Sequence, residues 1–201
     1  MPRHEVSINL DGKKYSIETG KMAKFANGSV MVRCEDTMVL VTATCSDEPI
    51  DAGFLPLSVE YREKTAAAGK IPGGFIKREG RPSEKEILTA RLIDRPIRPM
   101  LPSSWRYDTQ IVANVYSADP DVDAGVLGAV GASAALLISD VPFEGPISEV
   151  TIGRVEGEFV LNPSYEQLEK SDIEMTVAGT NAAILMVEGE SKEISEEEFL
   201  D

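Results

Sequence analysis

Apolar and polar residues alternate along much of the chain, a pattern typical of strands with one buried face. The clearest case is residues 5–19, where the alternation continues on both sides of Asp11-Gly12, a dipeptide that favours a tight hairpin turn. Similar runs predict further strands at residues 29–34, 38–44, 55–63 and 110–116. Two more hairpins are predicted at residues 150–161 and 173–187. Strand pairs therefore dominate the pattern.

A helix with clear boundaries is predicted after a loop. Residues 65–74 are rich in Ala and Gly, which is typical of a mobile loop. Ser83 and Glu86 then form the Ser-x-x-Glu pattern of a capping box, and apolar positions at helical spacing follow. Because proline disfavours helical geometry at the residue before it, Pro96 predicts that this helix ends near Asp94.

Two further helices are predicted. Residues 122–138 are rich in small residues and contain glycines at a spacing of three, which favour close packing against another element rather than dinucleotide binding. Ser195 and Glu198 form a second capping-box pattern, after which about one helical turn remains. Since so short a helix is unstable by itself, we expect the chain to be cut inside the last helix of a larger protein.

Charge is unevenly distributed along the chain. The 201 residues include 20 basic and 34 acidic side chains, and the resulting charge of −14 argues by itself against a nucleic acid partner. Residues 60–106, however, carry 11 basic and 6 acidic side chains, whereas the remainder carries 9 basic and 28 acidic ones. This segregation fits one anion-binding face, and it fits equally a helix whose cations pair with acidic neighbours in the fold.

Residues 73–102 concentrate the basic side chains. Seven lie in this run: Lys77, Arg78, Arg81, Lys85, Arg91, Arg95 and Arg98. Arginine stays charged and binds anionic groups, so a polyanion such as RNA is the expected partner. Arg91 and Arg95 are four residues apart and share a helix face if the last turn holds. Arg98 lies beyond the first proline, where helical spacing does not fix its direction.

The segment Phe75-Ile76-Lys77-Arg78 has the composition of a single-strand binding loop. It follows Gly73-Gly74, and it places one aromatic ring beside two cations. The ring can stack on a base while the cations neutralise phosphate, without reading the sequence of the strand. The alternative is a phenylalanine buried in the core with a charged loop outside, and the segment itself favours neither.

The sequence gives little support for a histidine-based site, a cysteine metal site or a membrane segment. His4 is the single histidine and is expected to be exposed near the start of the chain, so a triad or metal site built on several histidines is excluded. Cys34 and Cys45 lack metal-ligand spacing and are expected to be reduced core residues of a cytosolic protein, with a disulfide between them as the weaker alternative. The first ten residues lack the apolar core of a signal peptide, and no apolar run reaches the length of a membrane span.

Three aspartates alternate between residues 119 and 123, at the start of the second predicted helix. The segment lacks the length and the terminal glutamate of a calcium-binding EF-hand loop. Aspartate is also favoured at helix N-termini, where it caps free N–H groups and interacts with the helix dipole. Helix capping is therefore the preferred interpretation.

The chain resembles a known family. The run at residues 73–102 is similar to the signature of the first RNase PH-like domain of bacterial-type polynucleotide phosphorylases, and it is highly specific. Weaker similarity extends over the whole chain, including residues 36–43, 131–136 and 181–188. The resemblance implies an α/β (α+β) fold of mixed β-sheets packed with helices. It implies one RNase PH-like domain over residues 1–201, with its last helix truncated.

The resemblance also implies an activity. Members of the family degrade RNA from its single-stranded 3′ end by phosphorolysis, in which inorganic phosphate releases nucleoside diphosphates one at a time. They use Mg²⁺ and form a cytoplasmic homotrimer with a central RNA channel, which can associate with RNA-decay partners. The phosphate site and the metal-binding aspartates lie mainly in a second RNase PH-like domain. No catalytic residue, metal or cofactor site is therefore expected on this chain, whose role would be to supply channel and trimer surfaces.

Individual positions match the family's RNA channel. The family's channel loop is aromatic-aromatic-basic-basic and corresponds to residues 75–78, where Ile76 replaces the second aromatic and leaves Phe75 to stack on a base. The resemblance assigns RNA binding to Phe75, Lys77, Arg78, Arg81, Arg91, Arg95 and Arg98. The arginines would hold phosphates or brace the neighbouring active site, although Arg95 could instead pair with Asp94 or another carboxylate. A non-catalytic RNA-binding module and an assembly domain that never touches RNA remain alternatives.

Overall fold

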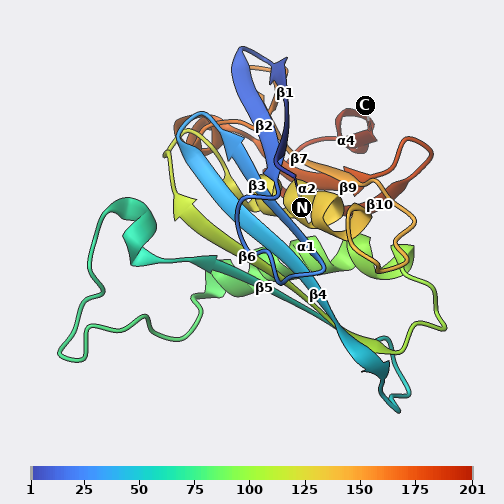
Figure 1. The fold of residues 1–201 in the computed structure, drawn as a ribbon. Coiled ribbons are helices and arrows are strands. Elements are labelled where there is room, and N and C mark those ends of the chain that lie inside the picture. Colours follow the sequence, from blue (N-terminus) through green and yellow to red (C-terminus); the bar gives the residue numbers. More distant parts are fainter. Residues whose placement is uncertain (1, 201) are drawn as a thin grey trace.

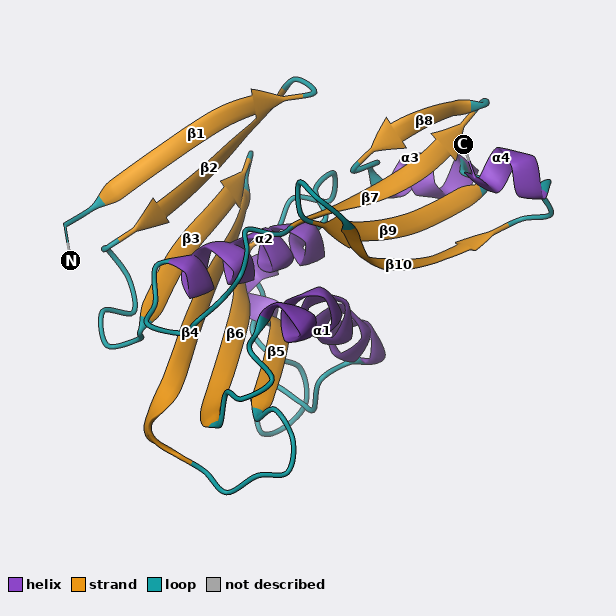
Figure 2. Cartoon of the chain, turned by 90° about the vertical axis from the view of Figure 1, so that its right-hand side faces the viewer, coloured by secondary structure: helices purple, strands orange, loops and turns teal. Residues whose placement is uncertain are grey.

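The protein folds into two sheets that lie on either side of a central helix (Figures 1 and 2). The structure is a computed structural model that describes residues 2–200. The strands of the first sheet are β1 (His4–Leu10), β2 (Lys13–Thr19), β3 (Gly28–Cys34), β4 (Thr37–Pro49), β5 (Leu57–Glu63) and β6 (Tyr107–Ser117). Those of the second are β7 (Ser148–Val155), β8 (Glu158–Leu161), β9 (Ile173–Gly179) and β10 (Ile184–Ser191).

The first sheet has the order β1-β2-β3-β4-β6-β5. Its strands pair antiparallel except for β5, which runs parallel to β6 and forms one edge. The predicted hairpin between β1 and β2 is confirmed, and both turn residues have a positive φ, 49° at Asp11 and 78° at Gly12. The predicted strands are all present, and β4 and β6 are longer than their apolar patterns suggested because polar residues continue the pairing at their ends.

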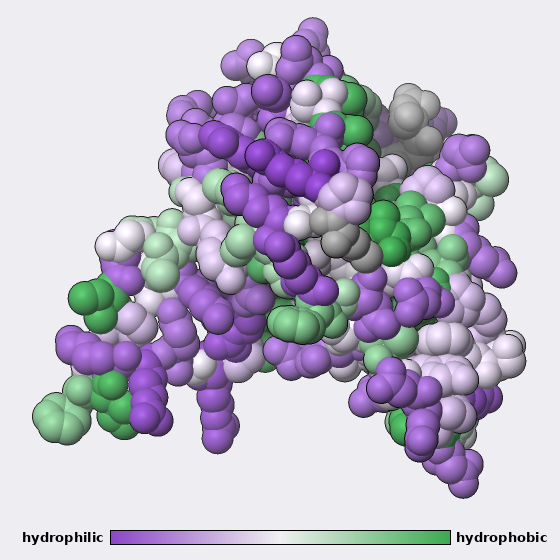
Figure 3. Space-filling view, in the orientation of Figure 1, coloured by the Kyte–Doolittle hydropathy of each residue, from purple (hydrophilic) through white to green (hydrophobic). Residues whose placement is uncertain are grey.

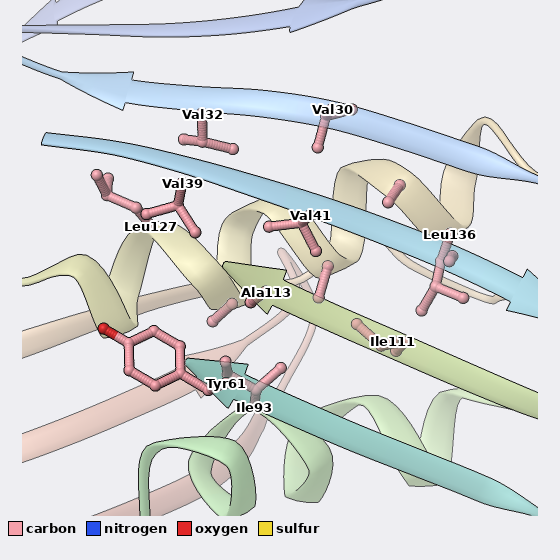
Figure 4. Packing of buried hydrophobic residues seen from close by; sticks show 14 of the residues in the cluster. Val30, Val32, Val39, Val41, Tyr61, Ile93, Ile111, Ala113, Leu127 and Leu136 are labelled. Atoms are coloured by element: carbon pink, nitrogen blue, oxygen red, sulfur yellow. The ribbon is translucent and has the colours of Figure 1, made fainter. Parts of the chain in front are cut away.

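The central helix α2 (Ala124–Leu137) contacts β3, β4 and β6 of the first sheet and β7 of the second. It is apolar on all sides, as expected for a helix covered on both faces. Its glycines allow close packing: a Cβ on Gly131 would lie 2.5 Å from Val41 Cγ2. Val41 belongs to the buried cluster that joins α2 to the sheet (Figure 4). The structural interpretation of these glycines is therefore confirmed.

Helix α1 (Glu84–Ile97) is longer than predicted. Its capping box of Ser83 and Glu86 is present, but the helix does not end at Asp94, because it continues through Pro96 and leads into the short 3-10 turn η2 (Arg98–Met100). The expected end was wrong for a tertiary reason. A proline inside a helix costs about 3 kcal/mol. Ile93, Pro96 and Ile97 are all buried, and burial of an isoleucine side chain contributes about 1.5–3 kcal/mol, which offsets the cost.

The second sheet has the order β10-β9-β7-β8 and is antiparallel throughout. Both of its predicted hairpins are confirmed. A short helix that the pattern analysis missed, α3 (Tyr165–Lys170), follows β8 and begins with a capping box of Ser164 and Gln167. The Ser-x-x-Gln spacing was a usable signal for it. Helix α4 (Glu196–Leu200) follows Ser195, whose side chain and backbone bond Glu198 as predicted.

Several single-residue expectations are also confirmed. His4 is exposed on β1, and the two cysteines are free, with Cys34 buried and Cys45 half-buried. Asp123 caps α2, where its carboxylate accepts the N–H of Gly125 at 2.8 Å.

Among the described residues, no helix is long and apolar enough to cross a membrane.

Candidate nucleic-acid interface

The segment between β5 and α1 projects from the body of the molecule and forms the long excursion at the left of Figure 1. We call residues 64–82 the projecting loop. It opens with the 3-10 turn η1 (Thr65–Ala68), which ends at Gly69 with a φ of 67°. The remainder of the loop contains no helix or strand. It carries Phe75, Lys77, Arg78 and Arg81, four of the seven residues assigned to RNA binding from the sequence.

Glu86 closes the base of the projecting loop. One carboxylate oxygen of this buried residue accepts the backbone N–H of Glu63 at 2.9 Å, and the other accepts that of Ser83 at 2.6 Å. Burial would raise the pKa of Glu86, but the backbone bonds from Ser83 and Glu63 outweigh it, so the pKa is lowered and the carboxylate stays charged. The capping residue of α1 thus also joins the two chain segments from which the loop leaves.

Two further sets of contacts join the beginning of the loop to its end. A carboxylate oxygen of Glu79 accepts the backbone N–H of Thr65 at 3.0 Å and the hydroxyl of Thr65 at 2.8 Å. Arg62 donates to the carbonyl of Gly80 at 3.2 Å and lies 3.6 Å from a carboxylate oxygen of Glu86. The sequence reasoning did not single out Arg62 or Glu79, because their partners are 14 or more residues away along the chain.

The tip of the projecting loop presents its side chains to solvent. Phe75 is 102% exposed and Ile76 is 71% exposed, and Lys77 and Arg78 are exposed beside them. Lys77 has a φ of 55°, a left-handed conformation that is uncommon for a lysine. Figure 3 shows hydrophobic and strongly hydrophilic side chains side by side on the projection at the lower left. The alternative of a core phenylalanine is therefore wrong: the ring is free to stack on a ligand.

Arg91 and Arg95 share one face of α1, because the last helical turn holds. Both line a groove of about 610 Å³ between α1 and strands β9 and β10. Arg95 forms an ion pair with Glu188 of β10, so the carboxylate that it meets lies 93 residues away and is not that of its neighbour Asp94. Arg91 is exposed, and it lines a second groove between α1 and the edge strand β5 as well.

Arg98 binds acceptors within the protein. Its guanidinium donates to both carboxylate oxygens of Asp94, at 2.6 and 2.9 Å, and to the carbonyls of Leu55 and Leu57, at 3.3 and 3.1 Å. This fork ties the end of α1 to the edge strand β5. Arg91 and Arg98 thus line the groove between α1 and β5 together. The loop tip with Phe75, Lys77 and Arg78 lines neither this groove nor the one beside β9 and β10, which we call the α1 groove.

A metal site is not apparent. Among the residues that the structure describes, no three histidine, cysteine, aspartate or glutamate side chains converge as a metal-binding group. Some carboxylates near the basic residues are engaged with protein groups, as Asp94 is with Arg98, whereas Glu174 and Glu190 line the groove beside Arg91.

Comparison with protein families gives two matches that cover nearly the whole chain. Domain 1 of the 3′ exoribonuclease family, RNase PH, matches residues 11–142, and domain 2 of the same family matches residues 145–201. The boundary falls between α2 and β7, where the first sheet is complete and the second begins. The two matches therefore follow the two sheets.

Two similar proteins of greater length share one name. The polyribonucleotide nucleotidyltransferase of Halalkalibacterium halodurans is 57% identical over 199 residues, which cover 99% of this chain and 28% of that protein. The enzyme of the same name from Geobacter sulfurreducens is 55% identical over 202 residues, which cover 100% of this chain and 29% of that protein. The chain therefore spans less than a third of the length of these relatives.

A solved structure shares the fold. The crystal structure of rice (Oryza sativa) Rrp46 superposes with a TM-score of 0.70 at 16% identity, covering 99% of this chain and 84% of that one. The α/β fold expected from the sequence is thus confirmed. Because the two family models match residues 11–142 and 145–201, the chain belongs to the 3′ exoribonuclease family typified by RNase PH.

Proposed function

We propose that the chain is the RNA-engaging part of a 3′-to-5′ exoribonuclease that degrades RNA by phosphorolysis. The observation that carries the proposal is the tip of the projecting loop, where a fully exposed phenylalanine lies beside two exposed cations. The relatives' shared name, polyribonucleotide nucleotidyltransferase, supports the reaction. The strand would enter by its single-stranded 3′ end, with bases stacked on Phe75 and phosphates held by Lys77, Arg78 and Arg81.

In phosphorolysis an oxygen of inorganic phosphate attacks the terminal phosphodiester. The bond from phosphorus to the 3′ oxygen of the preceding nucleotide breaks, that oxygen takes a proton, and a nucleoside diphosphate leaves. Such transfers depend mainly on positioning and on stabilisation of developing charge, and arginine can serve both. In this proposal Arg91, with its guanidinium exposed, meets RNA in the α1 groove, and Arg95 can exchange Glu188 for a phosphate there.

Arg98 has a different part in the proposal. Its guanidinium is held by Asp94 and by two carbonyls of the β5 segment, so it braces α1 against the sheet beneath the RNA path. In this proposal the chemical step, the phosphate site and Mg²⁺ belong to another part of the whole protein, since this chain spans less than a third of the length of its relatives. We further propose a homotrimer with a central channel, acting in the cytoplasm in mRNA degradation.

RNA binding is tested with the double variant Arg78→Ala and Arg81→Ala. Each phosphate contact on a single strand contributes about 0.7 to the slope of log affinity against log salt. We expect weaker binding of a labelled oligoadenylate and a slope lowered by about 1.4. The matched control replaces two exposed lysines outside the projecting loop, Lys21 and Lys24 between β2 and β3, with alanine. An unchanged affinity and slope in the loop variant would reject the RNA-binding role.

An assembly role is the second candidate, and one observation favours it. The edge strand β1 presents Val6, Ile8 and Leu10 at 67, 65 and 42% exposure, an apolar row on one strand face. If the chain serves assembly only, Val6→Ser with Ile8→Ser should lower the association state of the whole protein in sedimentation experiments. RNA affinity would then be insensitive to the loop arginines, which separates the two functions.

A further inference from the structure

Lys85 and Tyr165 connect the base of the projecting loop to helix α3. Lys85 lies in the first turn of α1, and Tyr165 is the first residue of α3. The ammonium of Lys85 donates to the hydroxyl of Tyr165 at 3.1 Å and lies 5.4 Å from the centroid of its ring. The same ammonium is 3.0 Å from a carboxylate oxygen of Glu63. Since Glu63 precedes the loop and Lys85 follows it, this ion pair spans the base of the loop.

The carboxylate oxygen of Glu63 that Lys85 approaches also accepts a hydrogen bond from a core residue. The hydroxyl of Tyr61, a residue that is 2% exposed, donates to Glu63 Oε1 at 2.8 Å. Burial and the charge of Glu63 both raise the pKa of Tyr61, so its hydroxyl remains a donor. Burial lowers the pKa of Lys85, but its bonds to Tyr165 and Glu63 outweigh this and raise it, so the ammonium remains charged. A continuous network thus runs from the core to α3.

We propose that Lys85 and Tyr165 are positioning residues for RNA binding, which hold the projecting loop in one pose and touch no RNA themselves. The inference rests on the proposed function, because the loop carries Phe75, Lys77 and Arg78. A single exposed ion pair contributes little to stability. A loop that is already held, however, loses less conformational freedom when RNA binds, and the gain appears as affinity.

Affinity and salt dependence distinguish a positioning role from a direct contact. Tyr165→Phe removes the hydroxyl that accepts from Lys85 and keeps the ring, while Lys85→Met removes the charge and keeps much of the stem. We expect three- to tenfold weaker binding of a labelled oligoadenylate by both variants, with an unchanged salt slope. Arg78→Ala, which removes a phosphate contact, should lower the slope by about 0.7. Lys24→Met, the same substitution at an exposed site outside the loop, is the control.

Trypsin provides a second measurement that does not involve RNA. It cleaves after Lys77 and Arg78 at the tip of the loop, and the rate of cleavage rises when the loop leaves its held pose. We expect Tyr165→Phe to speed this cleavage severalfold while the midpoint of thermal unfolding is unchanged. Tyr165→Phe neither adds nor removes a trypsin site, so its rates compare directly with those of the unsubstituted protein.

The outcomes separate the two proposals. A lower salt slope for Lys85→Met, equal to that for Arg78→Ala, would overturn the positioning role, because Lys85 would then contact phosphate. Unchanged affinity together with unchanged cleavage in Tyr165→Phe would also overturn it. If the unsubstituted protein binds no oligoadenylate, the proposed function fails, and the cleavage rate still decides whether Lys85 and Tyr165 hold the loop.

Discussion

Phe75 places an aromatic ring in water at the tip of a loop whose neighbouring side chains are cationic. Such a ring adds nothing to the core, so its exposure has no benefit for stability. Stacking on a nucleic acid base, by contrast, contributes about 1–3 kcal/mol and tolerates any base. Ile76 offers apolar surface without a ring, so the stacking capacity at this tip rests on a single residue.

Replacing Phe75 with alanine should therefore weaken RNA binding without affecting the fold. The loss of one stacked base corresponds to roughly a 5- to 150-fold lower affinity. Phe25, which is 106% exposed in the loop after β2, provides the matched control when changed to alanine. Fluorescence anisotropy with a labelled oligoadenylate and thermal unfolding measure both effects. Equal affinities for the two variants would contradict the stacking role.

Glu149 is a buried carboxyl group. It is 4% exposed, and its Oε2 atom has no hydrogen-bond partner among the residues that the structure describes. Burial, together with the charge of Asp123, raises its pKa to about 8. The folded protein therefore holds a proton that the unfolded chain releases at lower pH, and stability is lost as the pH rises from about 4.5 to about 8.

Glu149→Gln should remove this loss. At pH 9 the variant is expected to be more stable than the unsubstituted protein, by an amount on the order of 5 kcal/mol at most. At pH 5 the two proteins should differ much less, because the carboxyl is still neutral when folded. Thermal unfolding at both pH values provides the measurement. Glu158→Gln on the exposed strand β8 is the control, and an equal gain for Glu149→Gln at both pH values would rule out the titration.

At the scale of elements, the packing of α2 against the first sheet depends on the absence of a side chain at one position. The ideal Cβ position at Gly131 is 2.5 Å from Val41 Cγ2 and 2.9 Å from Val32 Cγ2. Both valines are 2% exposed or less and sit in the middle of the sheet (Figure 4). Neither can move without disturbing its neighbours, since protein interiors are close-packed.

Gly131→Ala is therefore expected to destabilise the protein although alanine favours helix. The gain in helix propensity is about 1 kcal/mol, and overpacking costs about 1–3 kcal/mol. We expect a lower midpoint in urea unfolding. Gly53→Ala, at a site where an added Cβ meets nothing within 4 Å, should leave the midpoint unchanged. A stabilised Gly131→Ala variant would show that α2 can shift away from the sheet.

Helix α1 shows how far a local pattern determines an element. The capping box of Ser83 and Glu86 predicts its start, because the cap is made by residues three apart. Its end was predicted three residues too early, since the burial of Ile93, Pro96 and Ile97 against the rest of the fold outweighs the local effect of proline. The second bond of Glu86, to the N–H of Glu63, has no counterpart in any local pattern.

At the scale of the whole molecule, this chain carries the projecting loop that we propose to bind RNA, and it spans less than a third of the length of its relatives. We therefore expect this chain by itself to release no nucleoside diphosphate from oligoadenylate in the presence of phosphate and Mg²⁺. The whole protein should release it under the same conditions. Chromatography of the products measures both. Turnover by the chain itself would contradict the proposed division of labour, and its absence from the whole protein would reject the enzymatic function.

The sequence by itself determined the hairpins, the capped starts of α1 and α4, the small-residue helix and the basic run, because each depends on residues close together along the chain. Only the tertiary structure decided that Phe75 faces solvent, that Arg95 meets Glu188, and that Lys85 reaches Tyr165. These contacts join residues 80 or more positions apart, or depend on what covers a side chain. The topology of the fold decides which distant residues meet and which side chains are covered. A local pattern of apolar and polar residues does not contain this information.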